Sequence, residues 1–410
     1  MEVFPINLWR NILSYLSLQE FLDAARICKK MKEVIYKTEW DHELIVCGDD
    51  DIIHLVSTYQ FRGFQIIPTV DHFENLHLLK NARVIRFTDS SFIWQWVFEN
   101  ENLHLMNEIA MELTECPELH ITIGRSKLND QVFERIGSAG KCQSIYMDDL
   151  VKDINLSNLI CCSKIYLYNA QNISDQGIMQ LARHRSPGGT IYLNIAVLLT
   201  DQSIEAFIQG GWDEIIIKNN EKITDSGISE LIKLKNLQVL KINEALVTGS
   251  GFVEFRGLKL LDLTDCKYLE TKYISEILVS GHHRSINLGN TNVTDECFQE
   301  QVNCGRIDLN ECVITNRALM ALSNCHTIEL YGCKLITDEG LTILSKFNFY
   351  RLGLSRCDSL TDQGLMTFRS EESFPCLQEL YLYNLAHVSD KMISILKDQM
   401  IHTKVYFHDN

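Results

Sequence analysis

A short motif, two apolar residues separated by one residue of any type, recurs along most of the chain and constrains the fold more than any other feature. It appears ten times, and successive copies start 21 to 28 residues apart. Repeats of this length cannot each bury an apolar face alone, but stacked copies bury theirs in one continuous core. The ten copies are Ile165-x-Leu167, Ile191-x-Leu193, Ile215-x-Ile217, Leu240-x-Ile242, Leu261-x-Leu263, Ile286-x-Leu288, Ile307-x-Leu309, Ile328-x-Leu330, Leu352-x-Leu354 and Leu380-x-Leu382. Fainter copies are Leu119-x-Ile121, Ile145-x-Met147 and Val405-x-Phe407. The period predicts a solenoid of stacked strands.

A second signal repeats in phase with these strands. A Ser-Asp or Thr-Asp pair follows most of them and precedes apolar residues at helical spacing, such as Leu341 and Leu344. The hydroxyl suits an N-cap, and the Asp suits the positive end of a helix dipole. Each unit is therefore predicted to be a strand, a turn, a capped helix and a return. The pairs are Ser174-Asp175, Thr200-Asp201, Thr224-Asp225, Thr294-Asp295, Thr337-Asp338, Thr361-Asp362 and Ser389-Asp390.

A small residue occupies one position just after each strand. It is cysteine in four repeats, at Cys266, Cys312, Cys333 and Cys357. Elsewhere it is Ala170, Ala196, Ala245 or Thr291, with Asn220 and Leu385 as exceptions. Cysteine behaves as a small hydrophobe in a core, and no CxxC pair or histidine at ligand spacing accompanies these four. We expect them to pack rather than to bind a metal.

These repeats resemble the cysteine-containing subfamily of leucine-rich-repeat proteins. The resemblance is carried by the Leu-x-x-Cys register and by the turn Ile-Thr-Asp-x-Gly-Leu from Ile336 to Leu341, which recurs as Leu360 to Leu365. It implies an α/β solenoid, a horseshoe with a parallel inner sheet and outer helices. We expect these repeats to cover residues 119–410.

Residues between the apolar positions of each strand are predicted to lie on the concave face, because side chains alternate along a strand. Several tyrosines with scattered charges, including Lys218 and Lys241, are typical of a protein-binding surface. A plainer interpretation is that exposed strands simply favour tyrosine. The candidate substrate-binding residues are Tyr166, Tyr168, Tyr192, Asp262, Asp308, Glu329, Tyr331, Tyr381 and Tyr383.

Residues 4–40 break the repeat pattern and are predicted to form a small helical module that ends at Trp40. About forty such residues cannot readily bury a core alone, so they need a partner or the next domain. Their order resembles the F-box: Phe4-Pro5, then Ile12-Leu13-Ser14-Tyr15-Leu16, then Ile27-Cys28-Lys29. Met31 and Asn7 depart from the family pattern, which has Trp and Glu there.

The F-box resemblance implies docking on a Skp-type adaptor, which links the chain to a cullin and a RING subunit. The residues that the resemblance places on the adaptor-facing surface are Pro5, Leu8, Ile12, Leu13, Leu16, Leu18, Phe21 and Leu22. Some of them must instead form the core of the module itself. We expect an F-box at residues 1–40 and, at 41–118, connecting helices (Ile52–Val56 and His72–Leu79) with a degenerate first repeat strand at Val84–Phe87.

The net charge of −16 narrows the classes of partner. Residues 1–40 are nearly neutral, so the remainder, with 32 basic and 49 acidic residues, carries the excess. An acidic body disfavours nucleic acid and favours a protein substrate with a basic surface. No secretory signal or bilayer-length apolar run occurs, so we expect a cytoplasmic or nuclear protein without membrane contact.

No catalytic pattern emerges, because neither GxSxG nor HExxH occurs. The stretch around Gly137–Lys141 is not a phosphate loop, because Arg135 replaces the first Gly of that motif and Cys142 replaces its Ser or Thr. We therefore predict no enzyme activity and no cofactor. The sequence favours the substrate-recognition subunit of an SCF-type (Skp–cullin–F-box) ubiquitin ligase, acting in protein degradation. The alternative is a non-ligase scaffold or inhibitor whose N-terminal helices only cap the solenoid.

Overall fold

The computed structural model describes residues 39–46, 60–66, 84–87, 118–123, 130–140, 142–147, 151–369, 374–400 and 402–407. The chain divides into two compact units, Met1–Ser186 and Pro187–Asn410. This boundary lies within the repeats, away from the predicted domain boundaries at 40/41 and 118/119. Each unit is described separately below.

In the first unit, six parallel strands are described, and they pair in sequence order. They are β1 (Glu39–Val46), β2 (Gln60–Ile66), β3 (Val84–Phe87), β4 (Glu118–Ile123), β5 (Cys142–Met147) and β6 (Lys164–Leu167). The helical segments are α7 (Asp130–Ala139), α8 (Asp153–Leu156), the 3-10 helix η2 (Ser157–Leu159) and α9 (Asp175–Ala182). The predicted strands at Val84–Phe87, Leu119 and Ile145 are confirmed.

Two strands of this unit were not predicted. Glu39 and Trp40 belong to β1, so the predicted helical run to Trp40 is wrong at its end. They pair with Gln60 and Phe61 of β2, and a register shift follows Trp40. Both strands carry an apolar-x-apolar triplet in register with the later repeats, because Leu44 and Val46 pair with Phe64 and Ile66, which pair in turn with β3. The sequence prediction omitted these two copies. The predicted helices Ile52–Val56 and His72–Leu79 lie outside the described residues.

In the second unit, ten strands pair in parallel and in sequence order. They are β7 (Thr190–Leu193), β8 (Glu214–Lys218), β9 (Val239–Asn243), β10 (Leu260–Asp262), β11 (Ser285–Asn287), β12 (Arg306–Asp308), β13 (Thr327–Glu329), β14 (Arg351–Gly353), β15 (Glu379–Tyr381) and β16 (Lys404–Tyr406). Motif residues pair with motif residues, as Ile286 does with Ile307 and Ile307 with Ile328. The predicted leucine-rich-repeat solenoid is confirmed.

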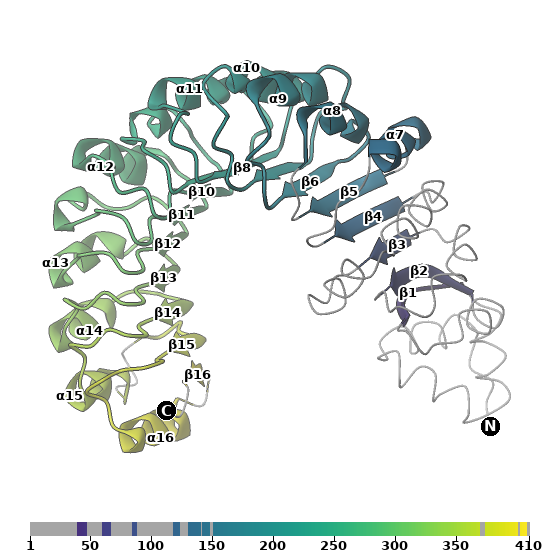
Figure 1. Cartoon of the computed structure of the whole chain (residues 1–410). Coiled ribbons are helices and arrows are strands. Elements are labelled where there is room, and N and C mark those ends of the chain that lie inside the picture. Colours follow the sequence, from purple (N-terminus) through teal and green to yellow (C-terminus); the bar gives the residue numbers. More distant parts are fainter. Residues whose placement is uncertain are drawn as a thin grey trace, which may run out of the picture. The chain divides into compact units, whose positions relative to one another are not determined.

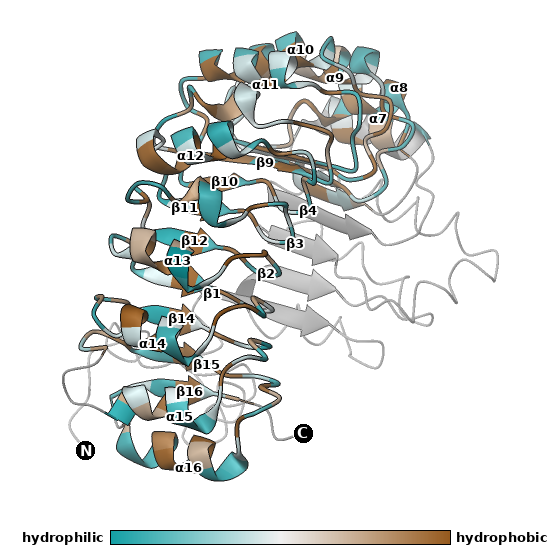
Figure 2. Cartoon of the chain, turned by 90° about the vertical axis from the view of Figure 1, so that its left-hand side faces the viewer, coloured by the Kyte–Doolittle hydropathy of each residue, from teal (hydrophilic) through white to brown (hydrophobic). Residues whose placement is uncertain are grey.

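Helical segments cover the side of this unit that faces away from its strands (Figure 1). The α-helices are α10 (Ser203–Gly210), α11 (Asp225–Glu230), α12 (Thr271–Ser280), α13 (Asn316–Leu319), α14 (Asp338–Leu344), α15 (Asp362–Leu365) and α16 (Asp390–Gln399). The 3-10 helices are η3 (Leu231–Lys233), η4 (Ser250–Phe252), η5 (Asp295–Cys297), η6 (Met320–Leu322) and η7 (Met366–Arg369). Figure 2 shows hydrophilic and hydrophobic residues along both α14 and α16, and these helices bury apolar residues such as Leu341, Leu344 and Leu396. No described helix is long and apolar enough to cross a membrane.

The repeated cysteines pack in the core, as predicted. Each thiol donates a hydrogen bond to a backbone carbonyl of the preceding repeat, for example Cys312 to Leu288 at 3.1 Å and Cys333 to Leu309 at 3.1 Å. Burial raises the pKa of the Cys266 thiol to about 11 and that of Cys357 to about 12. These thiols therefore stay protonated and serve as donors that join neighbouring repeats.

The predicted cap hydrogen bonds form at Thr224, Thr361 and Ser389, whereas Ser174 and Thr337 occupy the N-cap positions of α9 and α14 without accepting one. Thr224 and Thr361 accept hydrogen bonds from the backbone N–H groups of Ser226 and Gln363. The start of α10 at Ser203 is two residues later than the Thr200-Asp201 pair predicted. Thr294 precedes only the 3-10 helix η5.

The aspartates beside the caps have a role that the sequence did not indicate. Asp201 accepts hydrogen bonds from the backbone N–H (2.8 Å) and the hydroxyl (2.6 Å) of Thr224, one repeat later. Asp338 likewise accepts hydrogen bonds from the backbone N–H (2.9 Å) and the hydroxyl (2.6 Å) of Thr361. A Cβ at Gly227 would come closer than 3.0 Å to the Asp201 carboxylate, a distance that real Cβ atoms essentially never show. The glycine of the Thr-Asp-x-Gly turn therefore makes room for this inter-repeat link.

One residue per repeat of the second unit has a left-handed backbone, with φ between 52° and 70°. It directly precedes the position that cysteine occupies in four repeats. The residues are Ile195, Asn219, Glu244, Asp265, Asn290, Glu311, Gly332, Arg356 and Asn384. Ile195 is the one β-branched member, in a conformation that such residues rarely adopt.

Candidate protein-binding surface

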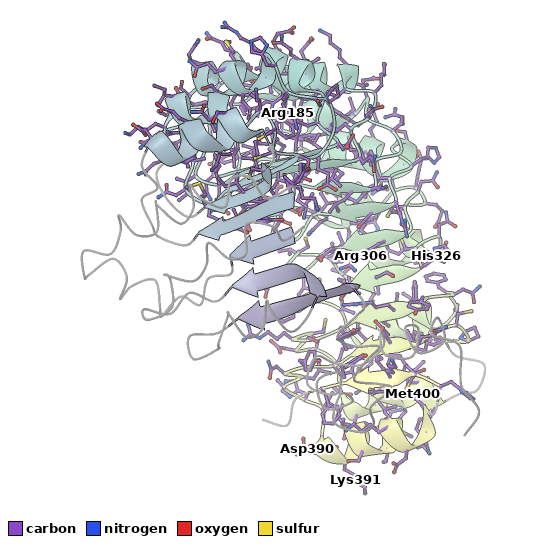
Figure 3. All side chains as sticks on the ribbon, turned by 90° about the vertical axis from the view of Figure 1, so that its right-hand side faces the viewer. Arg185, Arg306, His326, Asp390, Lys391 and Met400 are labelled. Carbon is purple, nitrogen blue, oxygen red and sulfur yellow. The ribbon has the colours of Figure 1, made fainter. Side chains whose placement is uncertain are left out.

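The strand side chains of the second unit that do not enter the core form rows across the sheet. We define the central row as the residues that the strand register pairs from β9 to β16. They are Lys241, Asp262, Asn287, Asp308, Glu329, Gly353, Tyr381 and Tyr406. The register thus brings four predicted site residues into one row. Arg306 lies beside it on β12 (Figure 3).

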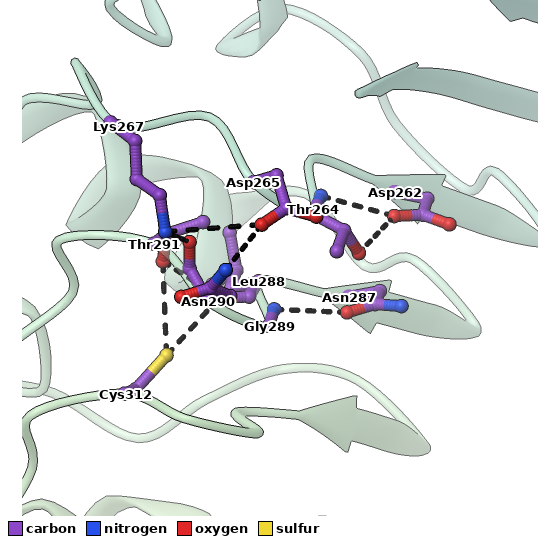
Figure 4. A network of polar contacts seen from close by, with 10 residues as sticks. All are labelled: Asp262, Thr264, Asp265, Lys267, Asn287, Leu288, Gly289, Asn290, Thr291 and Cys312. Atoms are coloured by element: carbon purple, nitrogen blue, oxygen red, sulfur yellow. Dashed lines mark hydrogen bonds and ion pairs between the residues drawn. The ribbon is translucent and has the colours of Figure 1, made fainter. Parts of the chain in front are cut away.

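Asp262 is held within the sheet rather than presented to a partner. Its carboxylate lies 3.5 Å from the Lys241 ammonium and accepts hydrogen bonds from the Asn243 amide at 2.8 Å and the Thr264 hydroxyl at 2.6 Å. Figure 4 shows the contact with Thr264 and the neighbouring turn, where Asn287 accepts from the Gly289 N–H at 3.0 Å. Only 7% of Asp262 is exposed, so it stabilises the strand end.

Glu329 is also neutralised within the chain. It lies 2.7 Å from Nε of Arg351 and 3.6 Å from the Arg306 guanidinium. A Cβ at Gly353 would collide with the Glu329 carboxylate, so the glycine lets the carboxylate lie over β14. Arg351 also reaches Glu379, at 3.4 Å. The sequence prediction omitted these arginines and Glu379, although strand alternation places them on the same face.

Tyr381 is fixed between two groups. Its ring centroid lies 4.3 Å from the Arg351 guanidinium carbon and 4.6 Å from the Tyr406 ring, which is nearly parallel at 13°. Its hydroxyl donates a hydrogen bond to Glu379 at 3.1 Å, and Tyr383 lies 6.2 Å away. We call Tyr331, Tyr381, Tyr383 and Tyr406 the tyrosine group; Arg356 lies 5.5 Å from the Tyr331 ring. Tyr406 was missed because its strand motif is faint.

Asp308 differs from the other two acids of the row. Its carboxylate accepts a hydrogen bond from the Asn310 N–H at 3.0 Å, and no ion pair between residues that the structure describes includes it. Burial raises the pKa of Asp308 to about 6, and the Glu329 and Asp262 carboxylates raise it as well, whereas the Asn310 N–H and the Arg306 charge lower it. Of the three acids, Asp308 is the one without an ion pair among the described residues.

The remaining predicted tyrosines lie at other places. In the first unit Tyr166 stacks on Tyr146, with ring centroids 4.4 Å apart, and Tyr168 is 41% exposed. Tyr192 of β7 is half-buried. Sequence reasoning passed over Tyr146 because its repeat is a faint copy. Among the described residues, no cluster of His, Cys, Asp and Glu could hold a metal ion.

The predicted adaptor-binding residues lie outside the described residues, so their arrangement stays a prediction. They are Pro5, Leu8, Ile12, Leu13, Leu16, Leu18, Phe21 and Leu22.

Comparison with known proteins identifies the N-terminal module. Residues 2–40 match the F-box domain. The chain thus carries an F-box domain, and its described repeats have the leucine-rich-repeat fold. No curated protein sequence matches it.

The solved structures that the chain matches share little sequence with it. A chain of the yeast Rad7–Elc1 complex has a TM-score of 0.50 and 13% identity, covering 98% of this chain and 90% of that one. A chain of the Drosophila Toll–Spatzle complex has a TM-score of 0.46 and 12% identity, with 96% and 54% covered. A leucine-rich repeat protein from Bacteroides eggerthii has a TM-score of 0.33 and 11% identity, with 93% and 79% covered.

Proposed function

We propose that this protein is the substrate-recognition subunit of an SCF-type ubiquitin ligase. The F-box match at residues 2–40, joined to a repeat sheet with an open face, carries the proposal. The F-box would bind a Skp-type adaptor and, through it, a cullin and a RING subunit. The repeats would hold the target protein, in the cytoplasm or nucleus.

The character of the sheet face supports a binding role without chemistry. Its acids are paired with lysine or arginine or hydrogen-bonded to the backbone, and its tyrosines pack against arginines and one another. The buried cysteine thiols are protonated, so they are poor nucleophiles. Such a receptor would accelerate ubiquitin transfer by holding the target near the ligase machinery.

The test is adaptor retention by the full chain. Purified protein is mixed with a Skp-type adaptor and analysed by size-exclusion chromatography, beside Leu13→Asp and the control Lys30→Ala. A charge on the predicted apolar surface should abolish co-elution, whereas Lys30→Ala should co-elute normally. Circular dichroism establishes that the repeats of Leu13→Asp remain folded.

Failure of the unaltered chain to retain the adaptor would remove the ligase proposal. The scaffold or inhibitor alternative would then account for the repeat surface. Equal retention by Leu13→Asp would reject the predicted adaptor-facing residues.

A further inference from the structure

One carboxylate in the central row, that of Asp308, makes no ion pair among the described residues, unlike the two other acids of the row. Asp262 is paired with Lys241, and Glu329 with Arg306 and Arg351. Asp308 accepts a hydrogen bond from the Asn310 N–H and is attracted by the Arg306 charge on its own strand, while the Glu329 and Asp262 carboxylates repel its negative charge. A cation brought beside Asp308 would relieve this repulsion, whereas an anion would add to it.

The tyrosine group supplies an independent reason to expect a ligand on the same face. Tyr381 is fixed between Arg351 and Tyr406, and its hydroxyl is bound to Glu379. Aromatic side chains that are already immobilised lose little conformational entropy when a partner binds. Tyr381 and Tyr406 thus form a prearranged aromatic platform at the C-terminal end of the row.

The register sets the separation between the two features. Asp308 is on β12 and the Tyr381–Tyr406 pair begins on β15, so three strand spacings, about 14 Å, separate them. An extended chain rises about 3.4 Å per residue, so about four residues span that distance.

We propose that the target binds this face as an extended peptide segment, with a Lys or Arg side chain at Asp308 and an apolar side chain against Tyr381 and Tyr406. Charge complementarity at Asp308 selects the basic residue, and the strand spacing sets the apolar residue about four positions away. This inference rests on the proposed function, since it names the kind of segment that the receptor would hold.

Selection from a random library tests the proposal without a known target. A displayed library of random 12-residue peptides is selected on the immobilised full chain, and the enriched peptides are sequenced. Parallel selections use Asp308→Asn, which keeps the acceptor for the Asn310 N–H, and Asp308→Lys. Glu276→Gln is the matched control, because Glu276 is exposed on α12, in the helical layer.

The unaltered chain and Glu276→Gln should enrich peptides with Lys or Arg about four residues from an apolar residue. A synthetic peptide from that set should bind Asp308→Asn about ten-fold more weakly, and Asp308→Lys should select acidic residues at the same place. Thermal unfolding of each variant establishes that it is folded; if Asp308→Lys is not, Asp308→Asn alone decides.

Enriched peptides without a basic residue, no enrichment at all, or an unchanged preference in Asp308→Asn would overturn the inference. Adaptor retention is measured on the same protein samples. Loss of the basic preference with the adaptor retained rejects the Asp308 site alone. Loss of adaptor binding with the preference intact rejects the ligase role alone.

Discussion

The link between Asp201 and Thr224 makes the glycine at 227 a steric requirement that can be measured. Gly227→Ala places a Cβ against the Asp201 carboxylate, an overlap that should cost about 1–3 kcal/mol of unfolding free energy. Alanine is favoured over glycine in a helix by about 1 kcal/mol, which offsets part of the cost. The net destabilisation should be about 1 kcal/mol, within a range of about 0–2 kcal/mol.

Removing the carboxylate should reverse the effect of the alanine. Asp201→Ala alone loses two hydrogen bonds to Thr224, at a cost of about 1–2 kcal/mol for a partly exposed pair. In that background the nearest contact left from residue 201 is its Cβ, at 3.2 Å. Gly227→Ala should then change the stability by about zero or raise it by up to about 1 kcal/mol. The double-mutant cycle should thus give a coupling of about 2 kcal/mol.

Urea unfolding followed by circular dichroism measures the four proteins of the cycle. Hydrogen exchange of α11 amides reports whether the change is local, as nearest-neighbour repeat coupling requires. Asp201→Asn is the matched control, since it keeps the size of the side chain and should keep Gly227→Ala unfavourable. An equal cost of Gly227→Ala in the unaltered chain and in the Asp201→Ala background would refute the steric account.

Three further measurements test other parts of the structure. Burial, with Arg256 and His282 nearby, lowers the pKa of His283 from 6.5 to about 4, so folding favours its neutral form. The free energy of unfolding is therefore not reduced by this site above pH 6.5, and it falls as the pH decreases, by about 3 kcal/mol at pH 4 and below. Urea unfolding at several pH values measures this loss. An equally steep loss in His283→Asn would contradict the prediction. Ile195→Asn should raise the melting temperature, because it removes about 1 kcal/mol of left-handed strain from a β-branched residue, and an unchanged value would exclude strain there. A hydrogen bond from Cys162 lowers the pKa of half-exposed Cys161 to about 7. Iodoacetamide at about pH 7.5 should therefore alkylate Cys161 well before the buried core thiols. Mass spectrometry of the labelled peptides measures the order, and the reverse order would contradict the burial pattern.

The repeat period predicted the leucine-rich-repeat fold because each unit must bury the same residues. Ile307, Ile328 and Leu352 pair in register, since apolar residues at equal positions meet when identical units stack. Local rules likewise predicted the caps at Thr224 and Thr361, because an N-cap depends on a few neighbouring residues. The F-box was visible for a similar reason, as its pattern is continuous in sequence.

Relations between repeats were out of reach of such local rules. Asp201 was assigned to the helix beside it, yet its carboxylate binds Thr224 of the next repeat. The same holds for Arg351, which joins Glu329 and Glu379 from strands on either side. Each partner lies more than twenty residues away, and only the strand register brings them together.

The sequence by itself thus determined the period, the burial pattern and the candidate face of this protein. Tertiary structure decided which acids on that face are neutralised and which tyrosines are held in place. The physical reason is that burial follows from the pattern along each strand, whereas compensation of a charge depends on neighbours from other repeats. Asp308 and Glu329 look alike in sequence, and the arginines of β12 and β14 make them different.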